Sequence, residues 1–341
     1  SLHPLLSLTY NNLGLVYEAK NQMDKAEAMY KKSLDIAQKT YGENHIITSN
    51  SRSNLATFYL EDNSLQKSTD LFRQNIINIS TIIQKEAPLM PLDERPLCIE
   101  RFSPDIDIIY SFTIQKKLPP SLALHARLNR QGILQDIERN QAKLIKGESQ
   151  KILIQLNETI RLISSLQKDS KAWAEAFVLK ERLEKKLYRS IPEYSPRTVE
   201  VMEVANVMPR GSLLLEFQAY YNSTGEKNTI DVPLEKGYLV ILLKPNGDVS
   251  AIDLGKADVI DAKIKKAILT TNEYLDDADR QWKELSKLIL DPIATELEGV
   301  ETVFISPDSE LNLIPFAALT TPKTNKYFSE VYNLRLLTTG R

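Results

Sequence analysis

The sequence predicts a protein of the α + α/β class, in which helical segments come first and an α/β segment follows. An internal repeat with a spacing of 42 positions occupies residues 1 to about 84. Strong helical periodicity of apolar residues follows between residues 150 and 190. From residue 195 onwards, short apolar runs typical of strands alternate with amphipathic helices, which favours a layered sheet. We therefore expect three domains, at residues 1–84, 85–194 and 195–341.

Composition and charge exclude several classes of function. The chain has 341 residues, of which 42% are apolar and 26% charged, as in an ordinary helix-rich soluble protein. Its formal charge of −2 provides no strong field for nucleic acid or anionic lipid. Cys98 is the single cysteine, which excludes an internal disulfide, and no apolar run reaches the roughly 18 residues of a membrane helix. We expect a cytoplasmic protein that binds neither nucleic acid nor membrane.

The repeat is defined by one short motif and its surroundings. Asn12-Leu13-Gly14-x-x-Tyr17 recurs as Asn54-Leu55-Ala56-x-x-Tyr59. A small residue at the third position lets paired helices approach closely, and the aromatic rings fill the remaining space. Each unit therefore predicts two amphipathic helices, which we place at residues 6–19, 25–40, 47–60 and 66–83.

This pattern resembles the tetratricopeptide repeat (TPR), in the 42-residue variety of kinesin light chains. The resemblance implies stacked helix pairs whose first helices line a groove for a protein or peptide partner, with Asn12 and Asn54 pointing into that groove. An amide there can pair with a partner's backbone as donor and acceptor. The alternative is that both asparagines only tie neighbouring helices together. Because about three units are needed for stability, we expect further units upstream or degenerate ones downstream.

Prolines interrupt the helical pattern between residues 88 and 120 and mark loops or short connectors. Residues 106–117 and 122–144 predict another pair of helices, interpreted as a degenerate repeat without the signature residues.

Residues 150–190 predict a long helical hairpin or a bent helix, because leucine and isoleucine recur along one stripe. A coiled-coil dimerisation arm is the alternative, but it would need more heptads than are present. We favour packing onto the next domain, with Trp173 and Phe177 as core residues, over an aromatic recognition box.

The C-terminal third is expected to alternate strands and helices. Ser195-Pro196 predicts the start of a short helix that ends near Val207. Pro245-Asn246-Gly247 has the chemistry of a hairpin turn between two strands. We place strands at residues 213–221, 238–244, 248–254 and 302–305, and helices at residues 257–274 and 279–296.

The segment from Ser306 to Leu319 is the most specific in the chain, and it reads Ser-Pro-Asp-Ser-Glu-Leu-Asn-Leu-Ile-Pro-Phe-Ala-Ala-Leu. It resembles the PDG-x-L-x-x-L/I-PF-x-A-L segment of the CHAT family, the caspase-like peptidase domain associated with tetratricopeptide repeats. Ser309 stands where the family has glycine. The resemblance implies that residues 195–341 form the front, non-catalytic part of a caspase-like α/β domain.

A caspase-like peptidase needs a thiolate, a histidine and donors that hold the oxyanion. The resemblance places that histidine and cysteine further along than residue 341. Of the histidines, His3 and His45 occupy equivalent repeat turns and His125 lies in an expected helix. We interpret Cys98 as a structural or incidental thiol. We therefore expect no catalytic residue in this chain and leave open whether the parent protein is an enzyme. No phosphate loop, paired-histidine zinc helix or Cys-x-x-Cys occurs, so no cofactor or metal is expected.

The resulting hypothesis is the recognition portion of a bacterial TPR–CHAT cysteine endopeptidase. In it the repeats recruit a protein partner or substrate, and the α/β part supports the remaining C-terminal part of the CHAT domain, which carries the catalytic residues. The alternative is a non-enzymatic TPR scaffold with a degenerate CHAT docking module. The absence of an initiator methionine suggests a piece of something longer. Arg341 is a possible processing site, and the alternative is an ordinary end of the sequence.

Overall fold

The computed structural model describes residues 5–90, 92–144, 147–167, 170–190, 195–222, 235–322, 324 and 326–341. His3 of the first repeat lies outside these residues. Internal contacts divide the chain into two compact units. Unit 1 comprises residues 1–79, 102–131 and 199–341, and unit 2 comprises residues 80–101 and 132–198. The two units are defined only by which residues contact one another. The three domains expected from the sequence stay a prediction.

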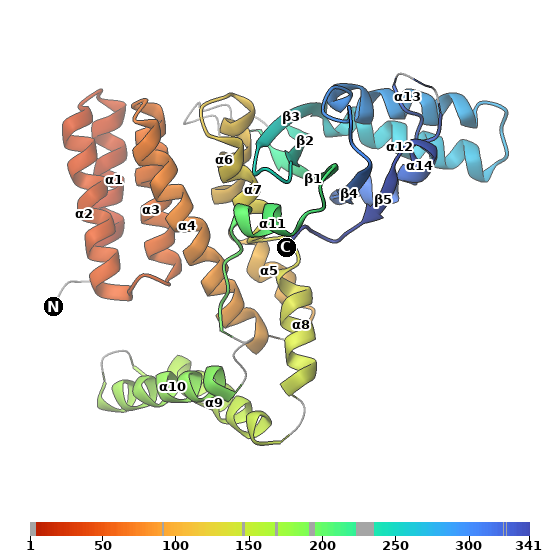
Figure 1. Cartoon of the computed structure of the whole chain (residues 1–341). Coiled ribbons are helices and arrows are strands. Elements are labelled where there is room, and N and C mark those ends of the chain that lie inside the picture. Colours follow the sequence, from red (N-terminus) through yellow and green to blue (C-terminus); the bar gives the residue numbers. More distant parts are fainter. Residues whose placement is uncertain are drawn as a thin grey trace. The chain divides into compact units, whose positions relative to one another are not determined.

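The repeat region forms antiparallel helix pairs, as the sequence predicted, and Figure 1 shows α1, α2 and α3 side by side. The ring of Tyr30 packs where Gly14 leaves room, and it also meets the ring of Phe58 with centroids 5.4 Å apart. In the second pair of helices, Ser68 Oγ donates to the carbonyl of Ala56 at 2.8 Å, which adds a polar contact between the two helices. The helices are α1 (Leu5–Ala19), α2 (Met23–Tyr41), α3 (Ile46–Glu61) and α4 (Leu65–Glu86).

The predicted helical hairpin is also present, and it lies in unit 2. Helices α9 (Glu148–Ser165) and α10 (Lys171–Ser190) bury a small core of Ile152, Leu156, Leu183 and Leu187. Trp173 and Phe177 were expected in a core, and this expectation was wrong. Their rings stack with centroids 5.1 Å apart, but Phe177 is 37% exposed and the pair lies outside the buried cluster. Unit 2 also contains α5 (Arg95–Glu100) and α8 (Ile133–Leu144).

The helix expected at residues 122–144 is broken in two. Helix α7 (Pro120–Leu128) ends before Gly132, whose φ of +77° favours glycine, and α8 begins one residue later. Helix α6 (Ser103–Ile114) precedes α7. Both α6 and α7 contact the strands of the sheet, so residues interpreted as a degenerate repeat supply one layer of the α/β structure.

The sheet is five-stranded with the order β3-β2-β1-β4-β5. The hairpin pairs β1–β2 and β2–β3 are antiparallel, whereas β4 runs parallel to both β1 and β5. In Figure 1, α6 and α7 lie on one side of this sheet, and α12 (Ala257–Asn272) and α13 (Ala278–Leu290) lie on the other. The strands are β1 (Ser212–Tyr221), β2 (Lys236–Leu243), β3 (Val249–Lys256), β4 (Thr302–Ser306) and β5 (Asn333–Leu336).

Alternation along β1 divides its side chains between the two layers. Leu213, Leu215 and Phe217 join the buried core that α12 and α13 cover. Glu216 and Gln218 point to the opposite face, where they contact α7. Short 3-10 turns and a four-residue helix connect β4 to β5, at η4 (Ser309–Leu313), η5 (Phe316–Ala318) and α14 (Phe328–Val331).

The helix expected to start at Ser195 begins later, at Val201, and forms α11 (Val201–Val207). The reason is a contact made by Asn129, the residue that directly follows α7. The amide of Asn129 accepts from the backbone N–H of Val199 and donates to its carbonyl, both at 2.8 Å. This pairing holds the backbone of Val199 outside the helix, and Glu200, in an extended conformation, serves as the N-cap of α11.

None of the helices in the described part of the chain is both long and apolar enough to cross a membrane.

Candidate functional site

The candidate site lies where β4 ends beside the middle of its parallel neighbour β1. Open α/β sheets bind ligands at the carboxyl ends of their strands, because the loops there converge. Glu216 of β1 lies in register with Ser306, the last residue of β4. Pro307 and Asp308 follow Ser306 directly, so the turn of the Ser306–Leu319 segment begins at this edge.

The guanidinium of Arg127 reaches this edge from α7 and joins both strands. Its Nε donates to Glu216 Oε2 at 3.0 Å, and its Nη1 donates to Gln218 Oε1 at 3.0 Å. Its Nη2 donates to Ser306 Oγ and to the carbonyl of Pro307, both at 3.2 Å. One side chain therefore fixes the end of α7 against the middle of β1 and the end of β4.

This cluster is charged and buried. Arg127 is 1% exposed and the Glu216 side chain is fully buried, so each charge depends on the other. Burial by itself lowers the pKa of Arg127, but Glu216 and Asp308 outweigh it and raise that pKa above its usual value. Asp308 also accepts from the backbone N–H of Ala219 at 2.9 Å. Structural contacts thus occupy its carboxylate.

The last residues of the chain are held at the same edge. Ser306 Oγ donates to the carbonyl of Thr338 at 2.9 Å. Glu216 uses its second oxygen to accept from Thr339 Oγ1 and from the backbone N–H of Gly340. Arg341 Nη1 donates to the carbonyl of Leu128 at 3.2 Å, at the C-terminal end of α7 where a cation is favoured. Processing at Arg341 stays a prediction.

Two buried groups of α6 border the cluster. Burial raises the pKa of Asp107 to about 6, although Arg130 and the backbone of Tyr221 oppose that shift. Tyr110 is fully buried, and its hydroxyl has no hydrogen-bond partner among the described residues. Sequence reasoning missed these groups and also Arg127 and Glu216. The visible signal was a single charged residue inside an otherwise apolar stretch.

The two groove asparagines occupy different environments. Asn12 is exposed on α1, and none of the hydrogen bonds found in the described residues involves its side chain. Asn54 is also exposed, but its Nδ2 donates to Asn11 Oδ1 at 2.8 Å, which links α3 to α1. Asn54 therefore has the helix-linking contact that the alternative described. A role for either residue in partner binding stays a prediction.

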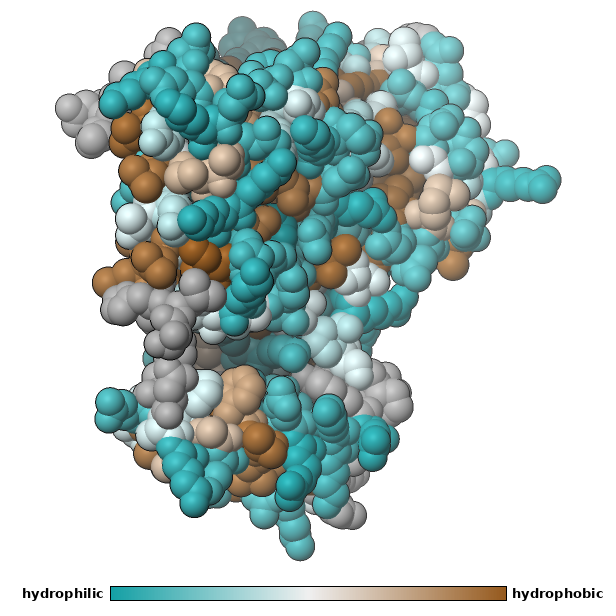
Figure 2. Space-filling view, turned by 90° about the vertical axis from the view of Figure 1, so that its left-hand side faces the viewer, coloured by the Kyte–Doolittle hydropathy of each residue, from teal (hydrophilic) through white to brown (hydrophobic). Residues whose placement is uncertain are grey.

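Helix α1 also exposes an apolar surface. Leu5, Leu8, Leu15 and Val16 are 62%, 58%, 42% and 48% exposed. Figure 2 faces the side of the molecule on which α1 and α2 lie, and it shows apolar patches between polar side chains there. Contiguous exposed apolar area on a soluble protein commonly marks a contact surface.

Among the described residues, Cys98 does not form a catalytic pair with His45 or His125. Cys98 is buried, and burial raises the pKa of its thiol, which disfavours the reactive thiolate. His125 is fully buried, and burial lowers its pKa to about 4 despite the nearby carboxylate of Glu200. His45 caps α3, because its Nδ1 accepts from the backbone N–H of Ile47 at 3.2 Å. Among the described residues, no group of three or more His, Cys, Asp or Glu could hold a metal ion.

Comparison with known families accounts for both ends of the chain. Residues 5–74 match the family model of the tetratricopeptide repeat, and residues 279–341 match that of the CHAT domain. The chain combines TPR helices with part of a CHAT domain. The CHAT segment begins at α13 and includes β4, β5 and the residues that close over Glu216. No match was found among curated proteins.

Proposed function

We propose that this chain is the recognition and supporting part of a caspase-like cysteine endopeptidase of the TPR–CHAT kind. Its TPR helices bind a protein partner or substrate, and its α/β part supports a catalytic lobe outside residues 1–341. The observation that carries this proposal is the presence of TPR and CHAT matches in one chain, together with a sheet in which β4 runs parallel to both β1 and β5.

The open edge of the sheet supports the catalytic half of the proposal. Among the described residues, β5 pairs only with β4, and Leu336 of β5 is 66% exposed. An unpaired strand edge can accept a further strand. In the resemblance to the CHAT family, the catalytic histidine and cysteine follow the segment present here. Strands added beside β5 would carry those residues to the edge that Arg127 and Glu216 organise.

The surface of α1 supports the recognition half. Leu8 and Leu15 flank Asn12 on the helix face, whereas the equivalent positions of α3 carry Asn50 and Thr57. Apolar side chains around an amide provide both buried area and a backbone hydrogen bond for a peptide segment. Tetratricopeptide repeats generally mediate contacts between proteins, so we assign partner recruitment to this surface. A reducing bacterial cytoplasm, as the single cysteine and the family resemblance favour, completes the proposal.

The test uses the full-length protein, with its catalytic lobe, and a variant that lacks residues 5–86. Proteins retained by immobilised residues 1–341 serve as candidate substrates, and intact mass spectrometry follows their cleavage. We expect cleavage by the full-length protein and a loss of at least tenfold in rate without the repeats. Candidate partners that stay intact with both proteins under every condition would remove the endopeptidase from the proposal.

A non-enzymatic scaffold is the second candidate. Among the described residues, Cys98 is buried with a raised pKa and the ring nitrogens of His125 have no hydrogen-bond partner, which is compatible with either candidate. The sequence that follows residue 341 in the full-length protein separates the two candidates. A strand-end histidine followed by a strand-end cysteine there favours the peptidase, and their absence favours the scaffold.

A further inference from the structure

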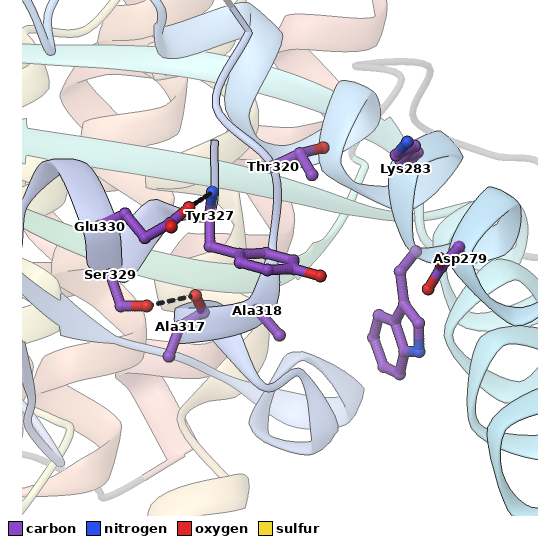
Figure 3. A pocket seen from close by; sticks show the side chains of 9 residues that line it. Asp279, Lys283, Ala317, Ala318, Thr320, Tyr327, Ser329 and Glu330 are labelled. Atoms are coloured by element: carbon purple, nitrogen blue, oxygen red, sulfur yellow. Dashed lines mark hydrogen bonds between the residues drawn. The ribbon is translucent and has the colours of Figure 1, made fainter. Parts of the chain in front are cut away.

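A hollow of about 500 Å³ lies between α13 and the chain that leads into α14. Asp279, Trp282 and Lys283 line it from α13, and Ala317, Ala318, Thr320, Tyr327, Ser329 and Glu330 line it from the other side. Figure 3 shows Tyr327 projecting its ring into the hollow, with Asp279 across from it and Ser329 and Glu330 behind it. We call this the Trp282–Tyr327 pocket. It is built by the CHAT segment and is separate from the groups that contact Arg127.

The walls of the pocket are fixed before any ligand arrives. The indole Nε1 of Trp282 donates to Thr271 Oγ1 of α12 at 2.8 Å. The backbone N–H of Tyr327 donates to Glu330 Oε2 at 2.6 Å, and Ser329 Oγ donates to the carbonyl of Ala317 at 2.9 Å. Preformed walls lower the entropy cost of binding, because few side chains have to be ordered.

Tyr327 has an exposed position that packing alone does not explain. Trp282 packs against the buried core of the sheet, but Tyr327 is 52% exposed at the mouth of the pocket. The next residue, Phe328, is fully buried and anchors this stretch of chain. The anchored backbone therefore presents an aromatic ring to the solvent side of the hollow.

The chemistry of the walls selects a cation. The indole N–H is already used by Thr271, so Trp282 offers its ring rather than a donor. Aromatic faces are electronegative and attract a cation at close range. Asp279 is exposed and has neither a hydrogen bond nor an ion pair among the described residues. Two rings and a free carboxylate thus complement a positive group on an apolar stem.

We propose that the Trp282–Tyr327 pocket binds a basic side chain of a partner protein, with its aliphatic stem against the two rings and its charged head at Asp279. Arginine suits the site better than lysine, because its planar guanidinium stacks on aromatic rings and pairs with a carboxylate by two hydrogen bonds. A protein segment suits the site better than a free amine. The half-exposed Tyr327 leaves the mouth wide, whereas small-molecule sites enclose most of their ligand.

This surface goes beyond the proposed function, since it would hold a basic segment at the CHAT part independently of the TPR helices. It is open to direct measurement because the chain has two tryptophans, Trp173 and Trp282. In a Trp173→Phe variant of residues 1–341, the indole emission comes from Trp282 alone. Titration with the blocked peptide acetyl-Gly-Arg-Gly-amide should change that emission saturably, with weaker binding for the lysine peptide and none for the norleucine peptide.

Three further variants in the Trp173→Phe background locate the binding. Asp279→Asn keeps the shape of the side chain but removes its charge, and should weaken binding of the arginine peptide about fivefold. Tyr327→Leu should weaken it by about fivefold or more through loss of the ring. Lys283→Met is the matched control, because Lys283 lies one turn from Asp279 on α13 and has the opposite charge. The Lys283→Met variant should bind the arginine peptide as tightly as the Trp173→Phe parent, or more tightly. Circular dichroism confirms that each variant is folded.

Several outcomes would overturn the proposal. One is an unchanged Trp282 emission with the arginine peptide at millimolar concentration. Another is equal affinity in the parent, Asp279→Asn and Tyr327→Leu variants. Spermidine serves as the probe for a free amine, and binding of spermidine without binding of the arginine peptide would assign the pocket to small amines instead.

Discussion

Arg127 and Glu216 form a buried ion pair that joins α7 to β1, with 3.0 Å between Nε and Oε2. Glu216 uses its other oxygen for Thr339 and Gly340, so one carboxylate connects a covering helix, a central strand and the end of the CHAT segment. Such a pair is costly to desolvate but still more costly to break, because either partner alone remains a buried charge. The edge of the sheet should therefore respond strongly to loss of either residue.

Arg127→Met should lower the free energy of unfolding of residues 1–341 by about 3–5 kcal/mol, because Glu216 and Asp308 lose their cation in a buried site. Urea denaturation followed by near-ultraviolet circular dichroism measures this change. The double variant Arg127→Met, Glu216→Gln should recover at least half of the loss, since the uncompensated carboxylate is gone. If the losses in free energy of unfolding from the two substitutions simply added in the double variant, the pairing would be contradicted.

Gly340→Ala should loosen the residues that close over Glu216. A Cβ at Gly340 would lie 2.5 Å from Leu214 Cδ2 and 3.2 Å from Glu216 Oε1, so the segment has to shift. We expect hydrogen exchange of the residue-340 amide to accelerate about fivefold, because its bond to Glu216 is weakened. Leu214→Ala in the same chain makes room and should restore slow exchange. Slow exchange in the single variant would show that Leu214 adapts freely.

The sequence was informative where one short pattern decided the local structure. Gly14 and the rings at the repeat positions were enough to predict the helix pairs, and the Ser306–Leu319 segment was enough to predict the CHAT fold. Periodicity could not reveal what covers a helix. Residues 106–117 and 122–144 were therefore interpreted as a repeat, although α6 and α7 lie on the sheet.

The candidate site was less predictable than the fold because its contacts are long-range. Arg127 and Glu216 are 89 positions apart, and nothing local identifies them as partners. The late start of α11 has the same origin, because the amide of Asn129 holds the backbone of Val199 from 70 positions away. For Glu216 the sequence signal was a charged residue within an apolar stretch, which indicates a buried contact without naming the partner.

Gly14→Ala should destabilise the repeat region, because its new Cβ would lie 2.8 Å from Cε1 of Tyr30. We expect a loss of about 1–3 kcal/mol in the free energy of unfolding, the usual cost of overfilling a packed site. Thermal unfolding by far-ultraviolet circular dichroism measures it. Tyr30→Leu in the same chain should relieve the crowding and recover most of the loss. Equal destabilisation in the single and double variants would indicate that the two side chains do not compete for space.

Asn12→Ala and Asn54→Ala should separate partner binding from stability. Asn54 Nδ2 donates to the buried Asn11, so its loss should cost about 1 kcal/mol of stability. Asn12 is exposed on α1, and its replacement should leave stability within about 0.5 kcal/mol while weakening partner capture. Calorimetry measures the first effect, and capture by immobilised residues 1–341 measures the second. Unchanged capture by the Asn12→Ala variant would remove that residue from the proposed groove.

Asp107 should make stability depend on pH between about 4 and 6. Burial raises its pKa to about 6 from the usual 3.8, so the folded state binds a proton at pH values where the unfolded state has released it. The contribution of Asp107 to stability is therefore greatest below pH 4, falls as the pH rises to about 6, and is constant above it. The total change is up to about 3 kcal/mol.

The Asp107→Asn variant isolates this effect from that of His125, whose pKa is lowered to about 4 by burial and which acts in the opposite direction. As the pH falls from 6.5 to 4, the unfolded state protonates His125 whereas the folded state keeps it neutral, so stability falls in both proteins. The difference between wild type and Asp107→Asn should thus be near zero at pH 4 and should reach about 2–3 kcal/mol in favour of the variant at pH 7. Urea titrations at half-unit pH intervals give both curves. Curves that run parallel across this range would mean that Asp107 has an ordinary pKa and that its surroundings are wetter than the structure shows.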